Sequence, residues 1–389
     1  MKVLVANIGS TSFKYRLYET KTECVLGSGK FERIGEIGGD YGDHASAIRR
    51  CLDEIAGPGK ALLNLMELDA VGFKAVHAGE MSGAQIVTGE ILAAMEEFAF
   101  FAPAHNPPYI AAMRAFQEQL PGLPLVALFE TAFYGQLDDA ATTYAVPYEW
   151  REQYGIRRYG FHGASHRAAS ERAQELLGRR DLRHISCHLG GSSSIAAIRN
   201  GVAVDTSFGT SPQSGLPQGS RVGDIDAFAV LYMMKKLGAG VDEMASLLAS
   251  RSGLAGISGT SGDVRDLQDV ARSGNKRAQL AIDVFVRAAR HYIGAFFVEL
   301  GGLDVLTFSG GIGENSAEIR SAICNRMSAL GIKLDETWNK TVEHRGTISV
   351  PDAAVKVLVL PADEEIVVAR ATAAALKRGE VASGVASRR

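Results

Sequence analysis

The chain has 389 residues, of which 46% are hydrophobic and 22% are charged, and its formal net charge is −3. These values are ordinary for a globular protein with a buried core, and the length favours roughly two to three domains. The small net charge gives no reason to expect a nucleic acid or an anionic membrane surface as a partner. No apolar run is long enough for a signal-peptide core or a membrane span.

The cysteines are too far apart in the sequence to suggest a metal or redox motif. No CxxC pair occurs among the four of them, which are Cys24, Cys51, Cys187 and Cys324. Isolated cysteines of this kind are typical of reduced thiols in cytoplasmic proteins. We therefore expect four buried core residues and a cytoplasmic location.

The first half of the chain predicts a three-stranded meander followed by alternating helices and strands. Residues 138–160 have no clear period and are expected to cross between domains. The expected strands are 2–7, 13–19, 24–32, 70–77 and 124–130, and the expected helices are 44–56, 91–101 and 108–119.

The second half repeats this pattern around a long Gly/Ser/Pro loop at 206–224. Its expected strands are 184–189, 194–199, 202–206, 303–309 and 355–360, and its expected helices are 225–237, 241–249, 276–300, 314–330 and 363–378. Three strands followed by strand–helix units, twice over, predict an α/β protein with a duplicated ribonuclease H-like, actin-like architecture.

Glycine- and serine-rich turns follow several of the predicted strands. The stretch 184–201 contains the turn Gly-Gly-Ser-Ser-Ser between two apolar runs, and residues 2–17 repeat this arrangement. Small residues leave backbone N–H groups free to face an anion. Two further loops, at 257–266 and 305–316, have the same character, and the second leads into a helix capped by Asn315 or Ser316. Four such loops indicate a nucleotide-binding protein.

Longer motifs at these loops resemble those of the acetate kinase family, and the resemblance runs nearly from end to end. The matching motifs are NIGSTSFK at 7–14, APAHNPP at 102–108, YGFHGASH at 159–166, HLGGSSS at 188–194, DTSFGTSP at 205–212, GSRVGDID at 219–226, SGDVRD at 261–266, SGGIGENS at 309–316 and ADEE at 362–365.

This resemblance implies a fold and an activity. The fold would be the duplicated ribonuclease H-like class of the acetate and sugar kinases, Hsp70 and actin, with two domains and a central cleft. Residues 1–134 with 366–389 would form an acceptor-side domain, completed by the C-terminal helix, and residues 135–365 a nucleotide-binding domain. The implied reaction is reversible, Mg²⁺-dependent phosphoryl transfer from ATP to a small carboxylate, which gives ADP and an acyl phosphate. The resemblance also implies a homodimer.

The resemblance assigns roles to individual residues. Arg221 and His162 would stabilise the transferring phosphoryl group, with Glu130 as a further catalytic residue. Asn7 and Glu364 would hold Mg²⁺, or Mn²⁺ in its place. The acceptor pocket would contain Lys74, Val76, Ala104, Phe161 and Pro212. ATP would contact Lys14, His188, Leu189, Gly190, Gly191, Ser192, Asp263, Val264, Arg265, Gly311, Ile312, Gly313, Glu314 and Asn315.

Most of these residues also have a structural interpretation. Arg221 would otherwise tie its own loop to Asp224 or Asp226, although a Gly/Ser-rich loop favours binding. Lys14 would otherwise be a solvated lysine on an exposed strand. Glu364 would offset the dipole of a helix start.

Two histidine pairs are spaced four residues apart, as two zinc ligands on one helix would be. They are His162 with His166, and His184 with His188. Both pairs flank predicted turns or strands, so we expect no zinc site. His166 is expected to cap or orient a neighbour, and His184 to be structural.

The sequence departs from the family pattern on the acceptor side. Lys74 replaces an arginine, which keeps the charge but loses a fork that fits a carboxylate. Glu130 replaces an aspartate, Tyr134 a histidine, Gly191 an asparagine and Ala104 a leucine.

Two interpretations of these departures follow. In the preferred one the acceptor is acetate or a somewhat larger acid, and the changes at Lys74 and Glu130 compensate for each other. In the other the protein is a weakly active nucleotide-binding relative. A third hypothesis is a sugar kinase with Glu130 as the base that a hydroxyl acceptor needs.

Overall fold

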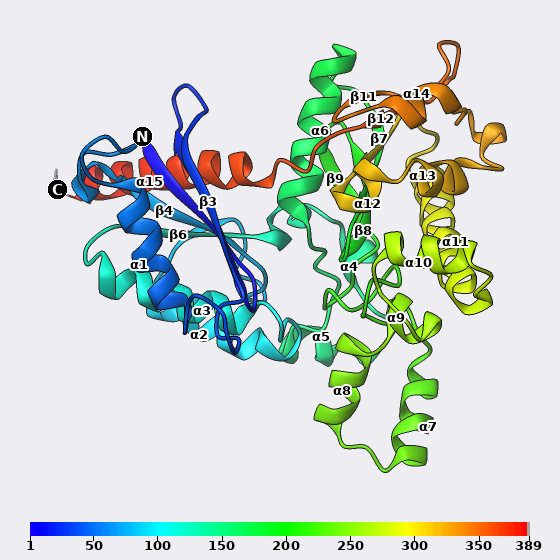
Figure 1. Ribbon diagram of the computed structural model, residues 1–389, viewed down its shortest axis with the longest axis horizontal. Coiled ribbons are helices and arrows are strands. Elements are labelled where there is room, and N and C mark those ends of the chain that lie inside the picture. Colours follow the sequence, from blue (N-terminus) through cyan, green and yellow to red (C-terminus); the bar gives the residue numbers. More distant parts are fainter. Residues whose placement is uncertain (387–389) are drawn as a thin grey trace. The chain divides into compact units, whose positions relative to one another are not determined.

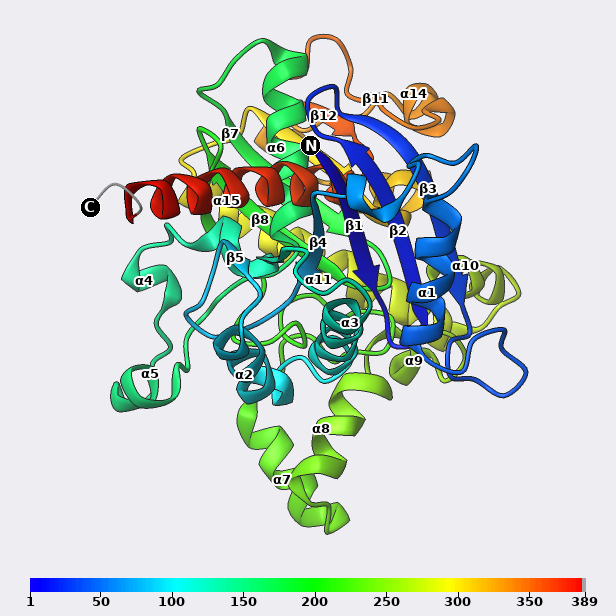
Figure 2. The ribbon, with the colours of Figure 1, turned by 90° about the vertical axis from the view of Figure 1, so that its left-hand side faces the viewer.

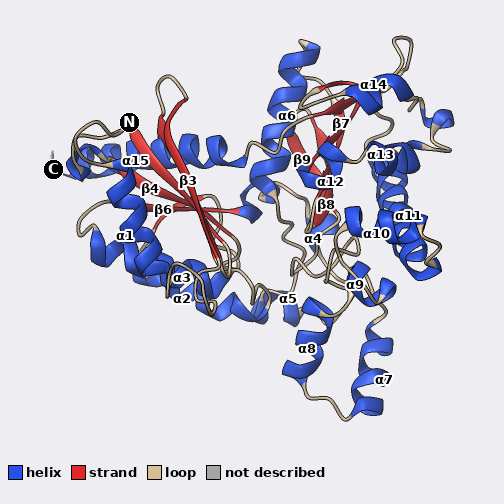
Figure 3. Ribbon diagram, viewed as in Figure 1, coloured by secondary structure: helices blue, strands red, loops and turns tan. Residues whose placement is uncertain are grey.

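The computed structural model describes residues 1–386, which form two compact units. Unit 1 contains Met1–Gly135 and the C-terminal segment from Asp363, and unit 2 contains Gln136–Ala362. Figure 3 shows that each unit combines a sheet with helices. No helix among the described residues is both long and apolar enough to cross a membrane.

Unit 1 is built on a six-stranded sheet with the strand order β3-β2-β1-β4-β6-β5. Strands β1 to β3 form an antiparallel meander, β4 and β6 run parallel to β1, and the short β5 is an antiparallel edge. Its elements are β1 (Lys2–Ile8), β2 (Ser12–Glu19), β3 (Cys24–Glu32), α1 (His44–Ile55), β4 (Ala70–Ala75), β5 (Ala84–Ile86), α2 (Gly89–Glu97), α3 (Asn106–Gln119), β6 (Leu125–Phe129) and α15 (Glu364–Ala386).

Helices cover both faces of this sheet, and β4 shows how its sequence specifies them. Successive side chains of a strand point to opposite faces. Phe73 packs edge-on against Phe116 of α3, with 5.5 Å between the ring centroids. Gly72 faces Val368 and Thr372 of α15. The chain therefore returns after unit 2 to cover the second face of the unit 1 sheet (Figure 2).

Unit 2 repeats the topology of unit 1 in the strand order β11-β12-β10-β7-β8-β9. A β7–β8–β9 meander is followed by the parallel strands β10 and β12 and an antiparallel edge, β11 (Figure 1). This repetition confirms the predicted duplicated fold. Its strands are β7 (Arg183–Leu189), β8 (Ser193–Arg199), β9 (Val202–Thr206), β10 (Val305–Ser309), β11 (Gly346–Thr347) and β12 (Lys356–Val359). Its helices are α4 (Asp139–Thr142), α5 (Glu149–Tyr154), α6 (Gly163–Leu177), α7 (Ala227–Leu237), α8 (Val241–Ser250), α9 (Gly253–Ser258), α10 (Val264–Arg272), α11 (Lys276–Glu299), α12 (Gly310–Asn315), α13 (Ala317–Cys324) and α14 (Glu336–Thr341).

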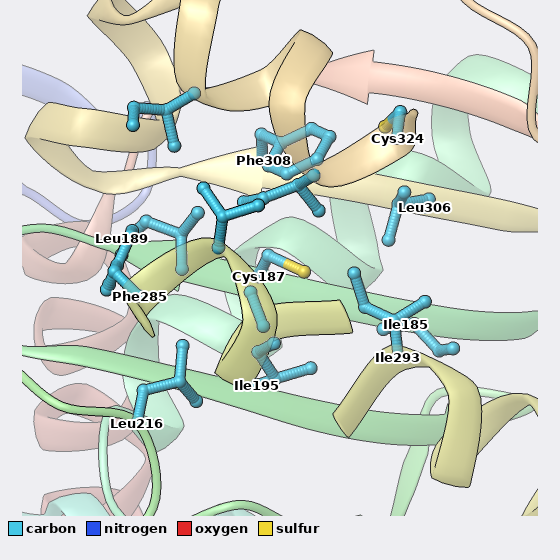
Figure 4. Packing of buried hydrophobic residues seen from close by; sticks show 14 of the residues in the cluster. Ile185, Cys187, Leu189, Ile195, Leu216, Phe285, Ile293, Leu306, Phe308 and Cys324 are labelled. Carbon is cyan, nitrogen blue, oxygen red and sulfur yellow. The ribbon is translucent and has the colours of Figure 1, made fainter. Parts of the chain in front are cut away.

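The two faces of the unit 2 sheet differ in chemistry. Alternate residues of β7, from Ile185 to Leu189, join the main core with Phe285 and Ile293 of α11 (Figure 4). On the other face, Ala169 of α6 packs in a small cluster with strand residues of β10 and β12. The remaining residues of β7 and β8 on the α6 face include several polar side chains, and these belong to the candidate site.

Several elements differ from the sequence-based expectations. The helix expected over 314–330 is interrupted and shorter than predicted. Helix α12 ends at Asn315, and α13 begins at Ala317 because Ser316 has an extended backbone and caps it through the amide of Ile319. Helix α13 ends at Cys324 and is followed by a 3₁₀ turn at Ser328–Leu330. The helix expected over 91–101 ends at Glu97 and continues as a 3₁₀ turn. The sequence did not predict the edge strands β5 and β11 or the helices α4, α5, α6, α9, α10 and α14.

Two smaller expectations also need correction. Cys24 is exposed at the start of β3, whereas the other three cysteines are buried. Residues 363–365, expected in the second domain, belong to unit 1. The reason is that Glu364 begins α15, which packs on the unit 1 sheet.

The close approach of α15 to β4 generates a stability prediction. A Cβ atom at Gly72 would lie 2.3 Å from Thr372 Oγ1 and 3.1 Å from Val368 Cγ1. We expect Gly72→Ala to lower the free energy of unfolding by about 1–3 kcal/mol, as overpacking of a core does. Gly89→Ala is the matched control, because a Cβ atom there meets nothing within 4 Å. Equal stabilities of the two variants in urea unfolding would refute this packing.

Candidate functional site

Four polar side chains form a hydrogen-bonded chain between α6 and the unit 2 sheet. Ser194 Oγ lies 2.8 Å from His162 Nδ1 and 2.8 Å from His166 Nε2. The second nitrogen of His166 lies 2.9 Å from Ser186 Oγ. A single serine hydroxyl therefore connects both imidazoles, and it fixes the orientation of the His162 ring.

The backbone before α6 places His162 at the edge of this chain. His162 precedes the helix in the left-handed region, with φ = 59°, which is uncommon for a residue other than glycine. Its ring packs against that of His188, with 4.3 Å between the centroids. His188 Nδ1 is in turn 2.7 Å from Ser165 Oγ. Strain at a residue held by several contacts is typical of a functional position.

The two histidine pairs lie in different surroundings. His162 precedes α6 and His166 lies in its first turn, where the sequence had predicted no helix. His166 orients its neighbour through Ser194, as predicted. His184 Nε2 lies 2.8 Å from Thr307 Oγ1 on the neighbouring strand β10, within hydrogen-bond distance. Within residues 1–386, no three His, Cys, Asp or Glu side chains are grouped so that they could hold a metal ion.

Arg221 lies in the loop before α7, where its guanidinium donates hydrogen bonds to uncharged side chains. Its Nη1 donates to Ser192 Oγ at 3.2 Å and to Gln218 Oε1 at 3.3 Å. Burial lowers the pKa of this guanidinium from its usual value. The carboxylate of Asp224 accepts hydrogen bonds from the amide of Gly215 and the hydroxyl of Tyr292.

A cavity of about 380 Å³ lies where three of the glycine-rich loops of unit 2 converge. It is formed by the β7–β8 turn, the start of α10 and the turn from β10 into α12 and α13. Its lining residues are Gly190, Gly191, Gly262, Asp263, Val264, Arg265, Gln268, Gly311, Ile312, Asn315, Ser316 and Glu318. Eight of the fourteen residues expected to contact ATP are among them.

Glycine serves two different purposes around this cavity. Gly310 has φ = 76°, and a Cβ atom there would lie 2.7 Å from the carbonyl oxygen of Leu189. Only glycine allows β10 to turn so close to β7. At Gly191 and Gly311, by contrast, a Cβ atom would meet nothing within 4 Å. These two positions leave open space beside the backbone.

Several expected nucleotide contacts do not line the cavity. Leu189 is buried in the core. A Cβ atom at Gly313 would contact Phe308 and Leu189, so this glycine serves packing. Glu314 accepts from the amides of Gly310 at 2.9 Å and Ala362 at 3.0 Å, so it braces the loop. Its carboxylate completes the β10 turn instead of facing the cavity.

Gln268 and Glu318 also line the cavity, although neither was expected to contact ATP. Gln268 lies one helical turn after Val264 and donates to Ser316 Oγ at 3.3 Å. The signal was present, because residues four apart share one face of a helix. It was overlooked because residues 257–266 were interpreted as a loop rather than the start of α10.

A larger cavity of about 740 Å³ is lined by residues of the Arg221 loop and of α11. Its wall includes Asp224, Arg251, Arg287 and Tyr292. None of the glycine-rich turns after β7 and β10 lines it. The smaller cavity therefore fits the sequence motifs, although it has less volume.

Unit 1 holds a buried charged group. Lys74 Nζ donates to Glu364 Oε2 at 2.6 Å, and Glu130 and Glu364 are 3% and 8% exposed. Burial alone would lower the pKa of Lys74, but the two carboxylates outweigh it and raise that pKa. The Tyr109 hydroxyl accepts from the amide of Ile8 and donates to Asn7 Oδ1 at 3.3 Å. The expected metal ligands and the departures at Lys74 and Glu130 thus belong to one unit.

The other expected acceptor and phosphate residues are divided between the units. Lys14 and Ala104 are exposed in unit 1, and Val76 is buried there after β4. Phe161 and Pro212 are buried in unit 2, where Phe161 packs edge-on against Phe208 at 5.7 Å between centroids.

Comparisons with known proteins agree with these motifs. A model of the acetokinase family matches residues 2–370. The acetate kinase of Clostridium novyi is 41% identical over 400 residues, which cover 98% of this chain and all of that protein. The crystal structure of Porphyromonas gingivalis acetate kinase has a TM-score of 0.86 and 37% identity, and covers 96% of this chain and 99% of that one. A propionate kinase from Francisella tularensis has a TM-score of 0.86 and 32% identity, with coverages of 95% and 98%.

Two buried imidazoles make the stability of unit 2 depend on pH. Burial lowers the pKa of His166 well below 6.5, and it lowers the pKa of His184 to about 3. As pH falls below 6.5, the unfolded chain binds protons at these groups that the folded chain does not. We therefore expect each histidine to reduce the free energy of unfolding by about 2 kcal/mol between pH 7 and pH 5.

Urea unfolding at the two pH values checks this expectation. His184→Gln removes one of the two groups, so its loss between pH 7 and pH 5 should be smaller than that of the wild type by about 2 kcal/mol. His344→Gln, at an exposed position, is the control and should lose as much as the wild type. The same loss in all three proteins would contradict the role of burial.

Proposed function

The chain belongs to the acetokinase family, and from that premise we propose how its residues perform the reaction. It is a carboxylate kinase, which transfers a phosphoryl group between ATP and a carboxylate. We propose acetate or a somewhat larger acid as the acceptor. Relatives named for acetate and for propionate both match nearly the whole chain, which supports a small acid.

The reaction needs charge stabilisation more than acid–base chemistry. A carboxylate with a pKa near 4–5 is already ionised at neutral pH, so no base has to generate the nucleophile. The difficulty is to bring an anion to the terminal phosphate and to stabilise the charge on its equatorial oxygens. Cations and hydrogen-bond donors meet this need, and a hydroxyl kinase would require a base in addition. The sugar kinase hypothesis is therefore not favoured.

We place the adenosine part of the nucleotide in the 380 Å³ cavity of unit 2. The space beside Gly191 and Gly311 admits a ligand close to the backbone. The apolar wall contributed by Val264 and Ile312 suits a base, and Gln268 and Asn315 offer hydrogen bonds to it. The convergence of three motif loops on one cavity is the observation that supports this placement most strongly.

Arg221 and His162 are proposed to stabilise the transferring group. The Arg221 guanidinium donates to Ser192 and Gln218, and its positive charge would bind a phosphoryl oxygen. Nδ1 of His162 lies 2.8 Å from Ser194 Oγ, which orients the ring. Ser194 and His166 act here as positioning residues.

Asn7 and Glu364 are proposed to hold Mg²⁺. Both offer hard oxygen donors, and Mg²⁺ in kinases uses one or two such ligands together with phosphate oxygens and water. When bound, the ion would neutralise charge on the phosphates. Tyr109 orients Asn7 by donating to its side-chain oxygen at 3.3 Å. Mn²⁺ is expected to replace Mg²⁺ at this site.

Lys74 is proposed to bind the acceptor carboxylate. Further acceptor-binding residues are proposed to be Val76, Ala104, Phe161 and Pro212. A lysine provides a single mobile ammonium instead of the fork of an arginine. The small side chain at Ala104 leaves space that a leucine would fill, and this favours acids somewhat larger than acetate.

Acyl phosphates react with hydroxylamine and sugar phosphates do not, which provides the test. We expect hydroxamate from ATP, Mg²⁺ and at least one of acetate, propionate and butyrate. Arg221→Ala should lower turnover by several orders of magnitude with little effect on ATP affinity, because a lost transition-state contact costs about 3–5 kcal/mol. Arg272→Ala, at an exposed arginine of α10, is the control. Near-normal turnover of Arg221→Ala would remove this residue from the mechanism.

We further propose that the protein is a homodimer through α7. No residue of this helix is buried, although it is largely apolar. Phe228, Leu231 and Tyr232 share one face and are 79%, 58% and 58% exposed. Figure 1 shows α7 and α8 projecting from the rest of unit 2. An exposed apolar face of this kind indicates a protein interface.

Light scattering tests the dimer. We expect a dimer for the wild type and a monomer for the double variant Phe228→Glu, Leu231→Glu, because two carboxylates would be buried in the interface. Phe100→Glu, at a 56% exposed phenylalanine of unit 1, is the control and should remain dimeric. A monomeric wild type would disprove this interface.

A further inference from the structure

The ion pair between Lys74 and Glu364 joins a proposed acceptor ligand to a proposed metal ligand. Lys74 lies on the same face of β4 as Gly72, which contacts α15. This register brings its ammonium to the first residue of α15, where Nζ and Oε2 are 2.6 Å apart. The two side chains are 19% and 11% exposed, so water screens the pair little.

Carboxylates hold the Lys74 ammonium in place. Glu364 binds it directly, and Glu130 is a second carboxylate that acts on it. Carboxylates beside one ammonium attract a further cation and oppose a second anion.

We propose that Lys74 is an exchangeable counter-ion, which binds Glu364 when no divalent cation is present and binds the acceptor carboxylate when a cation occupies Glu364. This inference rests on the proposed function. A divalent cation at Glu364 repels the ammonium, and the four-carbon stem of lysine lets it move. The released ammonium then meets the acceptor as its ion-pair partner.

This exchange couples the two ligands. With a cation at Glu364, the Lys74 ammonium is available to the acceptor carboxylate. Without the cation, the acceptor would have to compete with Glu364 for Lys74 and would add a negative charge beside the carboxylates. Metal and acceptor should therefore each increase the affinity of the other by the same factor.

Mn²⁺ binding measures this coupling without turnover. The full-length, nucleotide-free protein is titrated with Mn²⁺ while the electron paramagnetic resonance signal of free Mn²⁺ is recorded, with and without saturating acetate. For the wild type we expect acetate to raise the Mn²⁺ affinity at least about fivefold, the lower end of typical coupling between sites. Lys74→Met should bind Mn²⁺ more tightly than the wild type without acetate, and acetate should no longer change its affinity.

Lys2→Met is the matched control, because Lys2 also pairs with a glutamate, Glu67, at the opposite end of β1 from Asn7. It should behave as the wild type does. The proposal is overturned if Lys74→Met binds Mn²⁺ no more tightly than the wild type, or if acetate still tightens its binding. If Lys74→Met does not fold, the wild type alone tests the proposal. The proposal is also overturned if the wild type does not bind Mn²⁺, or if acetate leaves its Mn²⁺ affinity unchanged.

The hydroxylamine assay separates this proposal from the proposed function. If the wild type forms hydroxamate but acetate does not change its Mn²⁺ affinity, the exchange of partners at Lys74 is refuted and the proposed kinase activity stands. Coupling without hydroxamate from any acid would refute the proposed acceptors and leave the link between Lys74 and the metal site.

Discussion

The alternation of side chains on strands buried on both faces is the constraint on which both groups of candidate residues depend. Each central strand must satisfy two helical layers at once. In β7, Ile185, Cys187 and Leu189 meet the core under α11, which directs His188 towards α6. In β4, Phe73 meets α3, which directs Lys74 towards α15. Packing of the apolar residues thus fixes where the polar ones point.

The duplication separates two kinds of chemistry. Both units share the same strand order, but unit 1 gathers charged side chains and unit 2 gathers glycine-rich turns. Backbone amides, Arg221 and imidazoles suit phosphate and adenosine, whereas Lys74, Asn7 and Glu364 suit a carboxylate and a hard cation. One topology therefore presents different functional groups, because the residues at its strand ends differ.

Local pattern was sufficient for the sheets and insufficient for several helices. Apolar runs joined by glycine gave the meanders of both units, since a hairpin depends on neighbouring residues only. Helix α10 was missed because its first residues belong to a glycine- and serine-rich motif. The role of Glu314 was missed because its partner, Ala362, lies 48 residues away. The Lys74–Glu364 pair joins residues 290 positions apart, so only the folded chain reveals it.

A crystal structure of the protein with ADP tests the central claim most directly. The adenosine should lie in the 380 Å³ cavity of unit 2, against Val264, Gln268 and Ile312, with its phosphates directed towards the β7–β8 turn. Adenosine bound elsewhere, for example in the 740 Å³ cavity beside Arg251 and Arg287, would contradict the assignment of the glycine-rich loops.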